Sequence, residues 1–295
     1  MLAFTDRFVT IRQGLEEAGV TVRYEPGCGV HDAIEDGIEN ACAAVYESNI
    51  CVLCLGEDSS MSGESASVQH ITLPAVQLEL LENIAACHKP VILLLTNGRP
   101  LLLSDILPQA DAVVETWFLG HEAGHAISDV LLGHTEPTGH LTMSFPVSQG
   151  QIPVYYNHMN TGRPHKAGTP YVRFESNYMD GPNEPLFPFG FGLSYSSFGY
   201  SDLRVEGDTV RARVTNTGKI EASEVAQLYI SPPEGEGDKH RPPPRYGAVP
   251  AVCAGCGCFH CPPGAGTESL YPGTLAARRK PGRAVYGHDG HAAFL

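Results

Sequence analysis

The sequence predicts an α/β fold, with a largely parallel sheet flanked by helices in the first part of the chain and a shorter β-rich region behind it. Strand-like and helix-like segments alternate through the first half. Two of the strand-like segments, 49–57 and 90–98, are continuous apolar runs, as in strands buried on both faces of a sheet. Further on, polar and apolar residues alternate over 211–215, as in a half-buried strand.

The predicted elements of the first part can be justified in order. Segment 21–27 is short and β-rich, and 32–48 has apolar residues at helical spacing. After the strand at 49–57, an amphipathic helix at 72–88 has Pro74 near its first turn, where proline is tolerated. The remaining elements are the strand at 90–98, a strand at 112–118, a helix around 125–133 and a strand-like segment at 140–146.

This order of elements indicates where a functional site should lie. In a parallel sheet flanked by helices, ligands bind beyond the carboxyl ends of the strands. The informative loops are therefore those that follow Leu55, Thr96 and Phe118.

Composition narrows the class of protein. The chain has 295 residues, enough for one large or two ordinary domains, and a formal net charge of -14. This acidic balance argues against nucleic acid or an anionic membrane as the main partner. No apolar run reaches the length of a membrane span, the N-terminus lacks the features of a signal peptide, and no Asn-x-Ser/Thr sequon occurs.

A short motif at 121–125 raises the alternative of a zinc peptidase. His121-Glu122-Ala123-Gly124-His125 matches the H-E-x-x-H pattern, in which two histidines one helical turn apart bind zinc. The motif follows a predicted strand rather than lying inside a helix, and Gly124 disfavours a helix interior. The sequence therefore favours a helical turn with incidental histidines.

The loop after the first long strand carries two glutamates. It runs from Gly56 to Pro74, contains small residues, and includes Glu57 and Glu64. Two carboxyl groups can serve as a general acid and its electrostatic partner, but they can also be solvated loop acids. A loop of this length at the carboxyl end of a buried strand is costly to order without a function.

Five segments of the sequence carry a family resemblance: "CLGEDSSMSGESASVQHITLP", "KPVILLLTNGRPLLL", "ADAVVETWFLGHEAGHAISDVLLG", "GHLTMSFPVSQGQIPVYYNHMNTGRP" and "PLFPFGFGLSYSSF". Together they resemble the C-terminal half of bacterial β-glucosidases of glycoside hydrolase family 3. They occur in order over roughly residues 10–230. In the family, the segment around 117–133 has a Gly and a Glu at the positions of Gly120 and Glu122, so His121 and His125 are local variants without a metal role.

The resemblance implies a retaining exo-acting hydrolysis of terminal β-D-glycosidic bonds, with no cofactor and no metal. Glu64 falls on the family's acid/base residue. Glu57 matches a Glu at the start of the same loop and is a possible substrate-facing residue. The family's Asp nucleophile belongs to a barrel domain that precedes this region, and no position here can be assigned to it. We therefore expect the isolated chain to be inactive and the barrel domain to be its partner, together with a β-glucoside or oligosaccharide substrate.

The resemblance also predicts the domain organisation. Residues 1–197 correspond to the family's α/β sandwich domain, entered at the helix "MLAFTDRFVTIRQGLEEAG", and 198–231 to an incomplete fibronectin type III-like β-sandwich. Residues 232–295 are rich in Pro and Gly and predict a disordered tail, for which a truncated gene model or a shifted reading frame is one interpretation. The tail's Cys253, Cys256, Cys258 and Cys261 have spacings that zinc sites use, in surroundings that favour an unstructured segment. Relatives of this kind are mostly extracellular or periplasmic.

Other residues near the expected site have two interpretations each. His158 and Arg163 can face a sugar, or lie in a loop packed on the protein. Arg99, in the turn "NGRP", can orient a loop or face the barrel, and Trp117 can pack at a strand end or line a subsite. As a whole, the rival to an enzyme is a non-catalytic carbohydrate-binding or interaction module.

Overall fold

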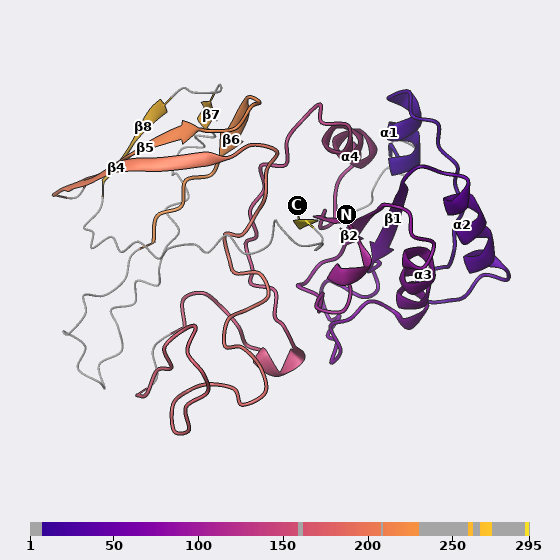
Figure 1. Cartoon of the computed structure of the whole chain (residues 1–295). Coiled ribbons are helices and arrows are strands. Elements are labelled where there is room, and N and C mark those ends of the chain that lie inside the picture. The colour runs from indigo at the N-terminus through magenta and orange to yellow at the C-terminus, as the bar shows by residue number, and fades with distance from the viewer. Residues whose placement is uncertain are drawn as a thin grey trace. The chain divides into compact units, whose positions relative to one another are not determined.

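The computed structural model describes residues 8–158, 162–207 and 209–229, and the backbone of three later strands at 259–261, 266–272 and 293–294. The chain divides into two compact units (Figure 1). Unit 1 contains the residues up to Glu136 together with Phe145–Ile152 and the last strand. Unit 2 contains Pro137–Ser144 and the described residues from Pro153 to the strand at 266–272.

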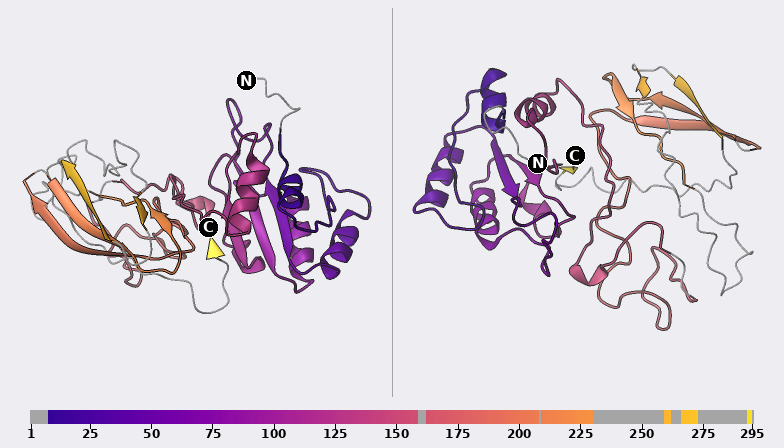
Figure 2. Two further views of the ribbon diagram at one scale, coloured as in Figure 1. Left: turned by 90° about the horizontal axis from the view of Figure 1, so that it is seen from above. Right: turned by 180° about the vertical axis from the view of Figure 1, so that it is seen from behind.

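Unit 1 is built on a parallel sheet, which confirms the α/β prediction. Its strands are β1 (Cys51–Gly56), β2 (Val91–Thr96), β3 (Ala112–Glu115) and β9 (Ala293–Phe294), in this order across the sheet and all parallel. The helices are α1 (Ile11–Glu17), α2 (Gly37–Tyr46), α3 (Ala75–Ala85) and α4 (Ala123–Leu131). Helix α1 packs on α4 and α2 packs on α3, and the two pairs lie on different sides of the sheet (Figures 1 and 2).

The core of unit 1 is centred on β2, as its continuous apolar run predicts. Leu93, Leu94 and Leu95 are 0% exposed although they point to alternate faces, so both faces of the strand are covered. Around them lie the other fully buried apolar side chains, which include Leu81, Ile84, Leu101, Leu103, Val113 and Phe145. Burial of one such side chain contributes about 1.5–3 kcal/mol, so this cluster supplies much of the unit's stability.

Two expected strands of the first part are absent from the described residues. Segment 21–27 forms no strand, because Tyr24 is 57% exposed and its ring stacks under the Arg12 guanidinium of α1 instead of joining the sheet. Segment 140–146 forms no ladder either. Leu141 exchanges one pair of backbone hydrogen bonds with Phe191 and Gly190, and Phe145 is buried in unit 1.

Unit 2 contains antiparallel strands. Strand β5 (Thr209–Asn216) lies between β4 (Phe198–Glu206) and β8 (Gly266–Pro272), and β6 (Ala222–Glu224) pairs with β7 (Phe259–Cys261). The period-two prediction for β5 is confirmed, since Val210 and Val214 are buried and Arg211 and Arg213 are exposed.

The structure also bears on the segments beyond residue 197. Segment 153–197, which the sequence groups with the first domain, belongs to unit 2. Strands β7, β8 and β9 come from the segment predicted to be disordered, and Cys253, Cys256 and Cys258 lie outside the described residues. None of the helices in the described parts combines the length and hydropathy that a membrane span requires.

Candidate active-site loop

The carboxyl ends of β1, β2 and β3 meet at one edge of the sheet. Gly56 is paired with Thr96, and Leu95 with Glu115, so the loops that follow these strands start side by side. The polar residues that open the loops therefore converge, as the sequence predicted for this edge.

Glu64 lies at the tip of the loop between β1 and α3, with its side chain exposed. Its neighbours have unusual backbone conformations, with φ of 132° at Gly63 and 63° at Ser65. A left-handed conformation costs a non-glycine residue roughly 1–2 kcal/mol, so the turn around Glu64 persists only because its surroundings hold it.

Arg99 supplies part of that support. Its Nη2 donates to the carbonyl oxygen of Met61 and, at 3.2 Å, to that of Ala66, on either side of Glu64. Its Nε lies 3.1 Å from Glu57 Oε1 without the geometry of a hydrogen bond, so this contact is an ion pair. The orienting interpretation of Arg99 agrees with these contacts.

Glu57 lies beneath the loop instead of on its open face. Its side chain is 2% exposed, and its Oε2 accepts a hydrogen bond of 3.0 Å from the Gly98 amide. Its own amide donates to the Thr96 carbonyl at 2.7 Å. A carboxylate engaged on both oxygens and covered by the loop fits a supporting role better than contact with a substrate.

Gly98 lets the turn after β2 approach the loop closely. A Cβ at this position would lie 1.9 Å from Ser62 Oγ and 2.8 Å from a ring carbon of Phe118. Any side chain at 98 would therefore displace the loop, which explains the glycine of the "NGRP" turn.

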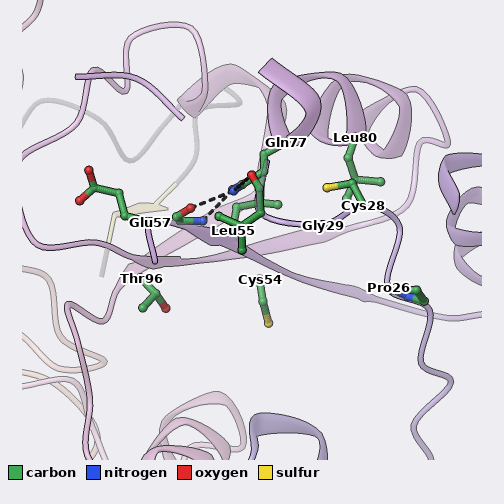
Figure 3. Close-up of a pocket in the computed structure, with 11 residues that line it drawn as sticks. Pro26, Cys28, Gly29, Cys54, Leu55, Glu57, Gln77, Leu80 and Thr96 are labelled. Atoms are coloured by element: carbon green, nitrogen blue, oxygen red, sulfur yellow. Dashed lines mark hydrogen bonds between the residues drawn. The ribbon is translucent and has the colours of Figure 1, made fainter. Parts of the chain in front are cut away.

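The two ends of the loop are fixed by side-chain amides and backbone. Gln77 of α3 accepts from the Gly56 amide at 2.8 Å and donates to the Gly56 carbonyl at 2.8 Å, as a neighbouring strand would (Figure 3). At the far end, Leu102 donates to the Ile71 carbonyl at 2.8 Å, and Gln149 Nε2 donates to the Gln69 carbonyl. The ends are thus anchored within unit 1.

A cavity of about 220 Å³ lies on the α3 side of β1, next to Glu57. Its lining residues include Cys28, Val30, Leu55, Gln77 and Leu80. The Gln77 amide points toward the end of β1 and has its hydrogen bonds satisfied by Gly56 and Val30, so the cavity's main polar group is already occupied (Figure 3).

Asp58 orders the first turn of the loop. Its Oδ1 accepts from the Ser60 amide at 2.8 Å and from the Ser60 hydroxyl at 2.6 Å, and its Oδ2 lies 3.1 Å from His31 Nε2. These hydrogen bonds, first those from Ser60, lower the pKa of Asp58 below its ordinary value.

Glu115, at the end of β3, is a half-buried acid that was not predicted as a site residue from the sequence. Burial raises the pKa of Glu115 to about 8, and two interactions lower it: a hydrogen bond of 3.1 Å from the Trp117 amide to Oε1, and the nearby Asn97 side chain. The contact with Asn97 lacks the geometry of a full hydrogen bond, since Oε2 of Glu115 and Oδ1 of Asn97 are buried without one. The sequence signal for Glu115 is that a charged residue ends the apolar strand Ala112–Glu115.

The H-E-x-x-H motif serves the contact between α1 and α4. The His121 ring stacks on Phe8 at a centroid distance of 4.6 Å, and the His121 carbonyl accepts from the Val9 amide. Both ring nitrogens of His125 contact carboxylates, Nδ1 that of Glu122 at 2.6 Å and Nε2 that of Glu17 at 2.8 Å. Among the described residues, no group of three or more His, Cys, Asp or Glu is arranged to hold a metal ion.

Gly124 also has a packing reason. A Cβ here would lie 2.1 Å from the Thr10 carbonyl oxygen, and the Gly124 amide donates to the Val9 carbonyl at 3.0 Å. The glycine therefore allows the start of α4 to touch the chain that leads into α1, and it lies in the first turn of α4 rather than in its interior.

His158 and Arg163 are described with unit 2, whereas Glu57 and Glu64 belong to unit 1. Both side chains are exposed. The His158 ring makes an edge contact with Tyr155, and the Arg163 carbonyl accepts from the Ser176 amide at 2.9 Å.

Comparisons with known proteins give a consistent result. Residues 4–195 match the model of the glycosyl hydrolase family 3 C-terminal domain. A periplasmic β-glucosidase of Salmonella typhimurium is 45% identical over 201 residues, which are 65% of this chain and 26% of that protein. A β-xylosidase of Formosa agariphila is 36% identical over 234 residues, which are 76% of this chain and 31% of that protein.

Solved structures agree with the sequence relatives. The crystal structure of a β-glucosidase from Listeria innocua superposes with a TM-score of 0.77 and 32% identity, over 91% of this chain and 37% of that one. The chain thus spans between a quarter and two fifths of the length of these relatives.

Proposed function

The chain belongs to glycosyl hydrolase family 3, whose C-terminal domain it contains, and we propose that it contributes the acid/base residue, Glu64, to a retaining exo-acting β-glucosidase. The Asp nucleophile would come from a barrel domain outside the described residues. The substrate class is a terminal β-D-glycoside of an oligosaccharide or small aglycone.

The observation that carries the proposal is the placement of Glu64. It is an exposed carboxyl group at the carboxyl edge of a parallel sheet, in a loop that buried contacts hold in a strained conformation. Such a group can donate a proton to a departing glycosidic oxygen and later activate water, provided that the nucleophile lies about 5–5.5 Å away. The family membership supplies the expectation of that second carboxylate.

The other candidate residues have different parts in the proposal. His158 and Arg163 are proposed to face the sugar, which their exposure permits. Glu57 is proposed to act beneath the loop, because its contacts with Arg99 and Gly98 leave its carboxylate covered.

The organisation of the whole enzyme is also a proposal. We assign residues 1–197 to the α/β sandwich domain, which the family match over 4–195 supports. We assign 198–231 to part of a fibronectin type III-like domain, which the antiparallel β4 and β5 support. A periplasmic or extracellular location is supported by the name of the Salmonella relative.

A chimera tests the proposal. Residues 4–195 would replace the matching region of the Salmonella typhimurium periplasmic β-glucosidase, so that a barrel domain is present. Rates would then be compared for aryl β-glucosides with good and poor leaving groups. Formation of the glycosyl-enzyme, which kcat/KM reports, needs proton donation most for a poor leaving group. Glu64→Gln should therefore lower that kcat/KM by roughly 10²–10⁴-fold, and kcat/KM for a dinitrophenyl glucoside much less.

The control is Glu79→Gln, the same change on the exposed surface of α3. It should leave both rates unchanged. An active chimera in which Glu64→Gln affects neither substrate would refute the proposal. If the purified chain bound oligosaccharide without hydrolysis in any assembly, and Glu64→Gln left that binding intact, the non-catalytic module would be the better description.

A further inference from the structure

We propose that Arg99 is a positioning residue for Glu64, and that Glu57 holds Arg99 in place for that purpose. The inference rests on the proposed function for its catalytic meaning, but the mechanical part stands on the contacts of unit 1 alone. This gives a role to the turn after β2, which contains Arg99 but no residue that is proposed to act as a catalytic acid or base.

The first step in the argument is the geometry of the guanidinium group. Nη2 of Arg99 bonds the carbonyl oxygens of Met61 and Ala66, which bracket Glu64 in the chain. These are bonds from a charged donor, which are stronger than bonds between neutral groups. One nitrogen at the end of the side chain thus fixes both sides of the turn while Nε faces Glu57. A lysine ammonium ends one bond short of Nη2 and has no second nitrogen to face Glu57.

The second step is the strain in the turn. Ser65, next to Glu64, adopts a φ of 63°, a left-handed conformation that is costly for a residue with a Cβ. The φ of 132° at Gly63, on the other side, is open to glycine without that cost. Within the loop, Met61 donates to the Asp58 carbonyl at 3.1 Å and Ala66 to the Gly63 carbonyl at 3.2 Å. Such a turn relaxes if its supports are removed, and the Glu64 carboxyl would then move.

The third step is the burial of the support. The Arg99 side chain is 18% exposed and that of Glu57 is 2% exposed. Glu57 is fixed in turn by the Gly98 amide and by its own backbone bond to Thr96. The chain of contacts therefore runs from the sheet edge through Glu57 and Arg99 to the loop, with little solvent to screen it.

The main test is hydrogen exchange in the full chain carrying Arg99→Lys. This variant keeps a positive charge beside Glu57 and shortens the side chain, so that the bonds from Nη2 to the loop carbonyls are lost. We expect the amides of Met61 and Ala66 to exchange at least about tenfold faster, the factor for loss of one charge-assisted hydrogen bond. Amides of β2 and β3 should exchange at unchanged rates.

Two further variants keep the result interpretable. Arg23→Lys makes the same change in an ion pair with Glu47 on the surface, and it should leave the loop amides unaffected. Since a buried Glu57 facing a poorly placed lysine can prevent folding, the double variant Glu57→Gln, Arg99→Met removes both charges together. It should show the same local acceleration.

A catalytic readout separates positioning from general stability. In the chimera with a barrel domain, Arg99→Lys should lower kcat/KM for the poor leaving group more than kcat/KM for the dinitrophenyl glucoside, as misplacement of the proton donor predicts. General destabilisation lowers both rates by the same factor.

The outcomes can be told apart. Loop amides that exchange at wild-type rates in the folded Arg99→Lys or double variant would overturn the inference, as would equal acceleration in loop and core. If the loop loosens as expected but Glu64→Gln has no effect in an active chimera, the positioning contact stands and the proposed function fails.

Discussion

At the scale of single residues, Glu115 gives the sharpest prediction about pH. The pKa of Glu115 is raised by burial from 4.5 to about 8, so the folded chain keeps a proton that the unfolded chain has lost. The stabilisation is full below pH 4.5 and disappears as pH rises through about 8. We expect Glu115→Gln to remove this slope and to be the more stable protein at pH 8.5, by about 2–4 kcal/mol.

Chemical denaturation from pH 5 to pH 8.5 measures this effect. The exposed Glu79→Gln serves as the control, and its profile should follow that of the unchanged protein. Parallel profiles for Glu115→Gln and the unchanged protein would show that the carboxyl group is ionised in the folded state.

Residue roles were only partly predictable from the sequence. The acid/base role of Glu64 is predicted from the resemblance to family members and not from its spacing. Glu57 was predicted as a possible substrate-facing residue. Its burial in the structure depends on Arg99 and Gly98, which are distant in the sequence. The role of Gly124 depends on a contact with Thr10 that no local pattern contains.

At the scale of elements, β2 is the strand on which unit 1 depends. Leu94 is 0% exposed in its middle, so Leu94→Ala leaves a cavity that the flanking helices cannot fill. We expect a loss of about 2–5 kcal/mol in the free energy of unfolding, measured by urea denaturation. Leu132→Ala deletes the same atoms at a site 40% exposed, and it should change stability by less than about 0.5 kcal/mol.

The contact between α1 and α4 depends on pH through His125. The pKa of His125 is raised above 6.5, first by the hydrogen bond with Glu17 and then by that with Glu122. Its stabilising effect is therefore full below pH 6.5 and is lost as pH rises through the raised value. His125→Ala should lower the melting temperature more at pH 6 than at pH 9.5, and an equal drop at both would contradict the ion pairs.

The buried strands were predicted more reliably than the short strands. The apolar runs at 49–57 and 90–98 became β1 and β2, since burial on both faces leaves a clear sequence signal. The strand predictions for 21–27 and 140–146 are wrong. A strand needs a neighbouring strand to pair with, and a short β-rich sequence does not show whether such a neighbour exists.

At the scale of the whole molecule, the account predicts that the 295-residue chain alone does not hydrolyse aryl β-glucosides. Retaining hydrolysis needs two carboxylates about 5–5.5 Å apart. Glu57, the acid nearest in the loop, is covered and engaged by Arg99 and Gly98. Circular dichroism on the same sample shows whether it is folded, and turnover that Glu64→Gln abolishes would mean that a carboxylate of this chain acts as nucleophile.

The most direct measurement of the central claim is azide rescue in the chimera carrying Glu64→Ala. Removal of the acid/base residue leaves the nucleophile able to form the glycosyl-enzyme with an activated substrate, and azide then attacks without needing a base. The account predicts restored turnover and a β-glycosyl azide product, identified by NMR. An α-glycosyl azide would make Glu64 the nucleophile, and an active variant that azide does not affect would remove Glu64 from the chemistry.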